Sequence, residues 1–236
     1  MGGDGMTDAP LAPPNGWHFC AMRDGVPVLR DGTLLVIGRT YRHEGDIEMC
    51  NSGYHDSLRA IDALRYAPGP YLCRTRVSGV VDSDDLKRVS RERTALVGAD
   101  VTDALHRLSW TVAYCALLAE REAGREPDPR SWDAVRVKRR WCAGEAEDAE
   151  LRAAESAAWP VVTPVTLWAV WAAARSAARS AVGSAAGLAA WAVVGSVAWS
   201  AAWAVVGSAS SAEGSAAWDR IDDLFAPMLP AELRDA

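Results

Sequence analysis

The sequence predicts an α+β fold, in which a small β-rich domain at residues 16–99 precedes an alanine- and tryptophan-rich helical region at 100–226. Short apolar runs, an Asp-Gly turn and an alternating stretch mark the first part, and they are typical of strands. Apolar residues recur at helical spacing in the second part. Residues 1–15 are rich in Gly, Pro and Asp, so we expect a flexible tail there, and residues 227–236 form the C-terminal tail.

The first domain is expected to begin with a strand at residues 17–22. The Asp-Gly pair within residues 30–33, which lies between two apolar runs, predicts a β-hairpin, because both central residues of such a turn need positive φ. A further strand is expected at residues 47–50. Leu58, Ile61 and Leu64 are spaced as on one helix face, so residues 57–66 are predicted to be helical.

The Pro-Gly-Pro sequence at residues 68–70 ends that helix. Residues 71–81 then alternate between two faces, as in a half-buried strand, and residues 94–97 are expected to complete the sheet.

Three helices are predicted in the second part, at residues 100–123, 128–142 and 145–159. The first begins with a sequence that resembles a capping box. The second begins with Asp128-Pro129, a capping residue followed by proline at the first helical position.

The chain of 236 residues has a net charge of −6, which argues against a general nucleic-acid binder. Its five cysteines form no C-x-x-C pair, and reduced thiols in a cytoplasmic protein are expected. The N-terminal residues lack the pattern of a signal peptide, which fits the same expectation.

Residues 180–212 contain no charged residue, and the sequence WAVVGS occurs in them twice. The stretch exceeds the roughly 20 residues that span a bilayer, so membrane association is one interpretation. The favoured alternative is a buried helical layer, because the stretch is dominated by Ala, Ser and Gly. On a helix, Trp191, Trp199 and Trp203 lie within about 120° of one another and form one indole face.

Four motifs mark the first domain: GWHF at residues 16–19, CNSGYHDS at 50–57, DALRYAPG at 62–69 and ERTAL at 92–96. Together they resemble a domain family of actinobacteria and their phages, whose members often carry Ala/Trp/Arg/Ser-rich tails. That resemblance implies no particular activity.

The helical part carries the motifs DPRSW at residues 128–132 and RWCAGE at 140–145. They are similar to the helical repeats of immunity proteins in bacterial toxin systems.

A strand–turn–helix–strand layout follows the CNSGYHDS motif and is similar to the middle of ADP-ribosyltransferase folds. The resemblance implies an enzyme that uses NAD. Tyr54, His55 and Tyr66 would bind the cofactor, and the two tyrosines would frame its nicotinamide. His18 would hold the ribose, and Glu92 would be the catalytic carboxylate that stabilises an oxocarbenium-like centre. The alternative is that the tyrosines pack in the sheet, the histidines end strands and Glu92 is solvated.

Cys50 and His55, together with His18 and Cys20, offer sulfur and nitrogen donors for zinc. Neither spacing is that of a closed zinc module, so we expect independent core cysteines and no metal. The sequence also has no Gly-x-Ser-x-Gly elbow and no phosphate loop.

These observations predict a non-enzymatic accessory protein of an actinobacterium or phage, which needs no cofactor. We expect its helical region to contact a protein partner or a second copy of the chain, with Trp191, Trp199 and Trp203 as anchors. Two alternatives stay open. One is an ADP-ribosyltransferase-like enzyme that uses NAD, and the other is a protein that residues 180–212 hold at a membrane.

Overall fold

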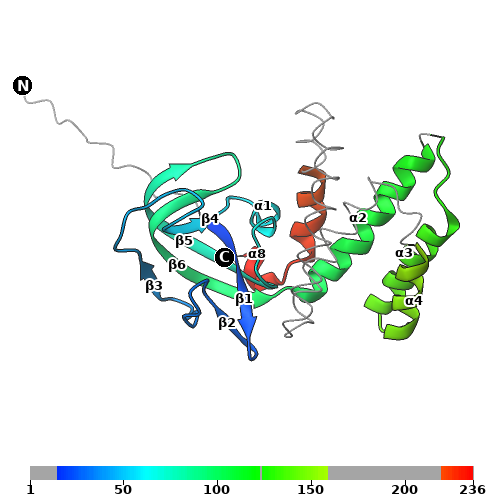
Figure 1. Cartoon of the computed structure of the whole chain (residues 1–236), viewed down its shortest axis with the longest axis horizontal. Helices are drawn as coiled ribbons and strands as arrows, with labels where there is room; N and C mark the ends of the chain where they lie inside the picture. Colours follow the sequence, from blue (N-terminus) through cyan, green and yellow to red (C-terminus); the bar gives the residue numbers. More distant parts are fainter. Residues whose placement is uncertain (1–14, 123, 159–218, 236) are drawn as a thin grey trace, which may run out of the picture.

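The computed structural model describes residues 15–122, 124–158 and 219–235, and it confirms the predicted α+β fold. A curled antiparallel sheet forms the N-terminal part, and helices extend away from it (Figure 1). The segment 180–212, with the predicted anchors Trp191, Trp199 and Trp203, lies outside the described residues.

Six strands form the sheet in the order β2-β1-β5-β6-β3, and β4 pairs with the same edge of β6 as β3 does. Their bounds are β1 Gly16–Arg23, β2 Val26–Val28, β3 Thr40–Arg42, β4 Tyr54–Asp56, β5 Tyr71–Ser83 and β6 Arg88–Asp100. Two backbone hydrogen bonds between Trp17 and Ser57, of 2.7 and 2.9 Å, join β1 to the end of β4. Strands β1, β5, β6 and β4 therefore close into a ring.

The first four helices follow the predicted order, whereas η2 and α8 lie where a C-terminal tail was expected. Their bounds are α1 Ala60–Leu64, α2 Thr102–Glu122, α3 Pro129–Cys142, α4 Asp148–Ala158, η2 Ala226–Met228 and α8 Ala231–Arg234, and residues 219–225 are also helical. The Asp128 carboxylate accepts a hydrogen bond from the Arg130 amide at 2.9 Å, which confirms the predicted cap of α3. None of the helices within the described ranges is both long and apolar enough to cross a bilayer.

A tight β-hairpin that was not predicted lies one Asp-Gly pair earlier, where Asp24 and Gly25 have φ values of 51° and 78° and connect β1 directly to β2. The chain also reverses at residues 30–33, as predicted: the Leu29 amide donates to the Thr33 carbonyl at 2.8 Å, and Val28 pairs with Leu34 in an antiparallel bridge. The Asp31 carboxylate accepts a hydrogen bond from the Thr33 amide in this turn. The residues after the turn form a single bridge and not the longer strand that was expected.

The main hydrophobic core lies where β1 and the first half of β5 meet α1 and the start of α2. Its fully buried members are Phe19, Ile61, Leu72, Val101, Leu105, Phe225 and Leu233. Val101 and Leu105 belong to the predicted helical region, yet they share this core with strand residues. Leu229 and Leu233, from the expected C-terminal tail, are buried in the same cluster.

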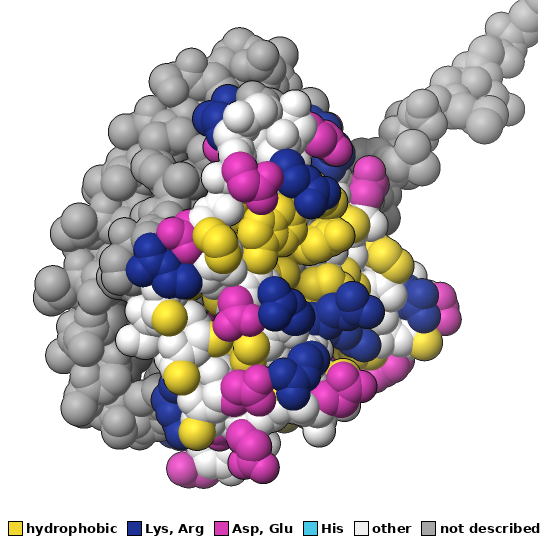
Figure 2. Space-filling model, turned by 90° about the vertical axis from the view of Figure 1, so that its right-hand side faces the viewer, with side chains coloured by type: hydrophobic (Ala, Val, Ile, Leu, Met, Phe, Trp, Pro, Cys, Tyr) yellow, Lys and Arg dark blue, Asp and Glu magenta, His cyan; other side chains and the backbone are white. Residues whose placement is uncertain are grey.

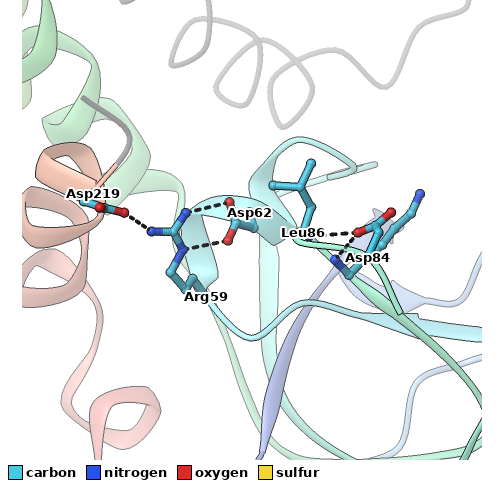
Figure 3. A network of polar contacts seen from close by, with 6 residues as sticks. Arg59, Asp62, Asp84, Leu86 and Asp219 are labelled. Atoms are coloured by element: carbon cyan, nitrogen blue, oxygen red, sulfur yellow. Dashed lines mark hydrogen bonds and ion pairs between the residues drawn. The ribbon is translucent and has the colours of Figure 1, made fainter. Parts of the chain in front are cut away.

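Arg59 connects the C-terminal residues to the first domain. Its guanidinium donates to the Asp62 carboxylate at 2.7 Å and forms an ion pair with Asp219 (Figure 3). In the same view, the Asp84 carboxylate accepts hydrogen bonds from the amides of Leu86 and Lys87, at 2.8 Å each. These bonds order the turn between β5 and β6.

A buried ion pair lies inside the ring of strands. Arg88 donates from Nε to Asp56 Oδ1 at 2.9 Å and from Nη2 to Oδ2 at 2.5 Å, and the Thr75 hydroxyl donates to the same carboxylate. The exposed fractions of Asp56 and Arg88 are 2% and 8%. A Cβ atom at Gly16 would lie 1.9 Å from Asp56 Oδ2, so glycine is needed where β1 passes the pair.

Replacing Asp56 with alanine would leave Arg88 buried without its counter-charge. We expect the free energy of unfolding to fall by about 3–5 kcal/mol, measured by urea denaturation. The control is Glu92→Ala, which removes the carboxylate of the exposed pair with Arg42 and should change stability far less. Equal losses in the two variants would contradict this role for the buried pair.

Candidate functional site

A pocket of about 740 Å³ opens on the first domain, next to the buried ion pair. Residues from β1, the loop after β2, the turn before β4, β4 itself and the end of α1 line it, together with Lys87 and Arg93. Its volume is in the range of pockets that bind small organic molecules.

Four residues predicted from the ADP-ribosyltransferase layout line this pocket together: His18, Tyr54, His55 and Tyr66. Glu92 is not among the lining residues. Its carboxylate accepts hydrogen bonds from Arg42 at 2.8 Å and from the Ser78 hydroxyl. Because successive side chains of a strand point to opposite faces, β6 directs the next residue, Arg93, toward the pocket instead.

Arg93 is the buried cation of the pocket, with an exposed fraction of 5%. Its Nη1 donates to the His55 carbonyl at 2.7 Å, and its guanidinium lies 5.1 Å from the centroid of the Tyr54 ring. Within the described residues, no carboxylate forms an ion pair with it, since the nearby Asp56 is bound by Arg88. Burial lowers the pKa of Arg93, but a guanidinium stays charged in proteins.

Two of the three histidines that line the pocket, His18 and His55, are held neutral. Burial lowers the pKa of His18, and the charge of Arg93 lowers it further. Burial also lowers the pKa of His55, with the charges of Lys87 and Arg93 acting in the same direction. His55 Nε2 accepts a hydrogen bond from the Cys50 amide at 3.0 Å, so its proton is on Nδ1.

Two buried thiols lie close together at the pocket, Cys20 on β1, which lines it, and Cys73 on β5, which does not. The hydrogen bond between them lowers the pKa of Cys20 and raises that of Cys73. His18 and Arg93 also favour the thiolate of Cys20.

A third thiol, Cys50, lies at the rim of the pocket in a turn, where a strand at residues 47–50 was expected. That prediction is wrong, because Cys50 has a φ of 69° and the chain reverses between Glu48 and Ser52. Lys87 Nζ lies 2.8 Å from Cys50 Sγ and 4.3 Å from the centroid of the Tyr66 ring. Burial acts to lower the pKa of Lys87, but the hydrogen bond to Cys50 acts in the opposite direction, and the pKa of Lys87 is raised overall.

The pocket is more positive than the acidic chain as a whole. Arg30, Lys87 and Arg93 line it, against the carboxylates of Asp31 and Asp56, of which Asp56 is neutralised by its own ion pair. Sequence reasoning missed all three cations. Arg93 could have been recognised from the alternation along its strand. Its side chain lies on the opposite face from Glu92 and on the same face as the buried Ala95.

No cluster of three or more His, Cys, Asp or Glu side chains suited to a metal ion occurs among residues 15–122, 124–158 and 219–235. Cys50 and His55, which offered donors for zinc, are instead linked through the backbone amide of Cys50.

Comparison of the chain with protein-family models, with curated proteins and with solved structures gives no match. The resemblances to a phage and actinobacterial family, to immunity proteins and to ADP-ribosyltransferases therefore stay predictions.

The neutral state of His18 makes stability depend on pH. Its folded pKa lies below the value of the unfolded chain, near 6.5, so the unfolded chain takes up a proton first as the pH falls. The contribution of His18 to the free energy of unfolding is fully present above about pH 6.5 and is lost as the pH falls below that value. In His18→Asn the free energy of unfolding should decrease less steeply as the pH is lowered. We expect the slope to be smaller by up to about 1.4 kcal/mol per pH unit, measured by urea denaturation from pH 8 to about 5. Parallel profiles for the two proteins would contradict a buried neutral His18.

Proposed function

We propose that the first domain is a binding module for a small anionic molecule, which carries a phosphate or carboxylate group into the pocket. The observation that supports this most is Arg93, a buried cation that faces a pocket and forms no ion pair within the described part of the chain. The buried Cys20 thiol, whose pKa is lowered, offers Arg93 a partial counter-charge, and a bound anion would reduce the cost of burying the guanidinium further.

The rest of the pocket suits such a ligand. Lys87 and Arg30 add positive charge around it, and the neutral histidines can donate hydrogen bonds without adding charge. Tyr54 and Tyr66 supply flat apolar walls for the remainder of the molecule. A guanidinium is also the cation whose geometry matches carboxylate and phosphate groups best.

Binding is tested by calorimetry of the full chain with inorganic phosphate, adenosine monophosphate and citrate as probes. Arg93→Met keeps the size of the side chain and removes its charge. We expect the dissociation constant of the tightest probe to rise about 30-fold or more, since losing a buried charge pair costs about 2 kcal/mol or more.

The matched control is Arg76→Met, because Arg76 is exposed on the neighbouring strand and does not line the pocket. It should leave binding unchanged. Equal affinity in wild type and Arg93→Met, with both proteins folded, would overturn the proposal.

NAD belongs in the same titration because four residues of the ADP-ribosyltransferase layout line the pocket. That alternative needs a carboxylate at the bound ribose, and Glu92 is engaged by Arg42 and Ser78 instead. Binding of NAD without release of nicotinamide would fit a binding module. Release that Glu92→Ala abolishes would favour the enzyme.

A second candidate function, self-association, rests on the aromatic face of α2 and α3. Trp110 and Trp132 are half-buried there, each with an arginine over its ring, and Tyr114 beside Trp132 is 42% exposed. Figure 2 shows hydrophobic side chains gathered on the helical side of the molecule, with basic ones next to them.

The occupant we propose for this face is a second copy of the chain. Its support is the exposed Tyr114 beside the half-buried Trp132, since the basic end of α3 and the acidic start of α4 are already joined within the chain by the ion pair of Arg140 and Glu150 at 2.6 Å.

Tyr114→Glu places a charge at the exposed centre of the aromatic face. We expect wild type to sediment as a dimer at high protein concentration and Tyr114→Glu as a monomer. A wild-type protein that stays monomeric over the whole concentration range would contradict self-association.

A further inference from the structure

We propose that Cys50 is a nucleophilic thiol, poised by Lys87, that forms a mixed disulfide with a small anionic disulfide entering the pocket. The anionic nature of the partner rests on the proposed function of the pocket, whereas the nucleophilic thiol does not.

The contact between Lys87 and Cys50 is the first support. The Lys87 ammonium lies 2.8 Å from Cys50 Sγ, and the side chain is only 8% exposed. No carboxylate in the described ranges forms an ion pair with Lys87, and the nearby Asp84 carboxylate accepts from backbone amides instead. A thiolate at Cys50 is therefore the anion that this buried ammonium can stabilise.

Access to the sulfur is the second support. Cys50 is exposed at the tip of a turn, with a φ of 69°, and it lines the pocket that contains Arg93. Cys20 and Cys73 are buried, and Cys115 is exposed on α2 but does not line the pocket. Among the described cysteines, Cys50 thus combines an open approach, a neighbouring ammonium and space for a ligand.

The reaction is a thiol–disulfide exchange. The Cys50 thiolate attacks one sulfur of the incoming disulfide, a new sulfur–sulfur bond forms, and the old one breaks. The leaving thiolate takes both electrons of the broken bond and then accepts a proton from solvent. Lys87 keeps its charge and stabilises the attacking sulfur, while Arg93 holds a carboxylate of the bound half.

The nucleophilic thiol is tested by alkylating the full chain with iodoacetamide at pH 6.5 and following each cysteine by mass spectrometry. We expect Cys50 to react about tenfold faster than the exposed Cys115. Lys87→Met should reduce the rate at Cys50 to that at Cys115, and Lys87→Arg should restore it. Equal rates for Cys50 and Cys115 in wild type would overturn the proposal, whether or not Lys87→Met folds.

Oxidised glutathione, which carries carboxylates, tests the anionic partner in a parallel reaction. Arg93→Met should slow formation of the mixed disulfide at Cys50 much more than it slows alkylation by uncharged iodoacetamide. Fast alkylation with no effect of Arg93 on the glutathione reaction would contradict the anion site while leaving the reactive thiol supported. Slow alkylation with strong anion binding would contradict the reactive thiol alone.

Discussion

The ion pair between Asp56 and Arg88 is the interaction on which the first domain depends. It joins β4 to β6, accepts a hydrogen bond from Thr75 on β5, and requires glycine at residue 16 of β1. All four strands of the ring therefore meet at one carboxylate. Removing either partner would leave a buried charge uncompensated, which is among the costliest changes that a small domain can undergo.

The same pair determines the charge of the pocket. Asp56 lines the pocket but is bound by Arg88, so it does not neutralise Arg93. Lys87, which also lines the pocket, contacts the sulfur of Cys50 instead of a carboxylate. The chain as a whole carries a net charge of −6, yet two buried cations line this pocket without a carboxylate ion pair among the described residues. The proposed anion site and the proposed reactive thiol both rest on this arrangement.

Local sequence signals were sufficient for the fold class and for helices α1 to α4, because capping residues and helical spacing act within a few residues. They missed α8 and the tight hairpin at Asp24-Gly25, since α8 and the strand β2 are only four and three residues long. Strand register also decides which of Glu92 and Arg93 faces the pocket, because a shift of one residue moves each side chain to the opposite face of the strand. His18, Tyr54, His55 and Tyr66, which were selected from the motifs, line one pocket. Arg93 and Lys87 were missed, since their importance depends on partners that are distant in sequence.

The proposed anion site depends on the buried guanidinium of Arg93. The most direct measurement is nuclear magnetic resonance of the arginine Nε–Hε groups during titration with inorganic phosphate, with the Arg93 signal assigned from its loss in Arg93→Met. The account predicts that this signal shifts and saturates at lower phosphate concentration than the signals of exposed arginines. An Arg93 signal that stays unchanged while the exposed arginines shift would contradict it.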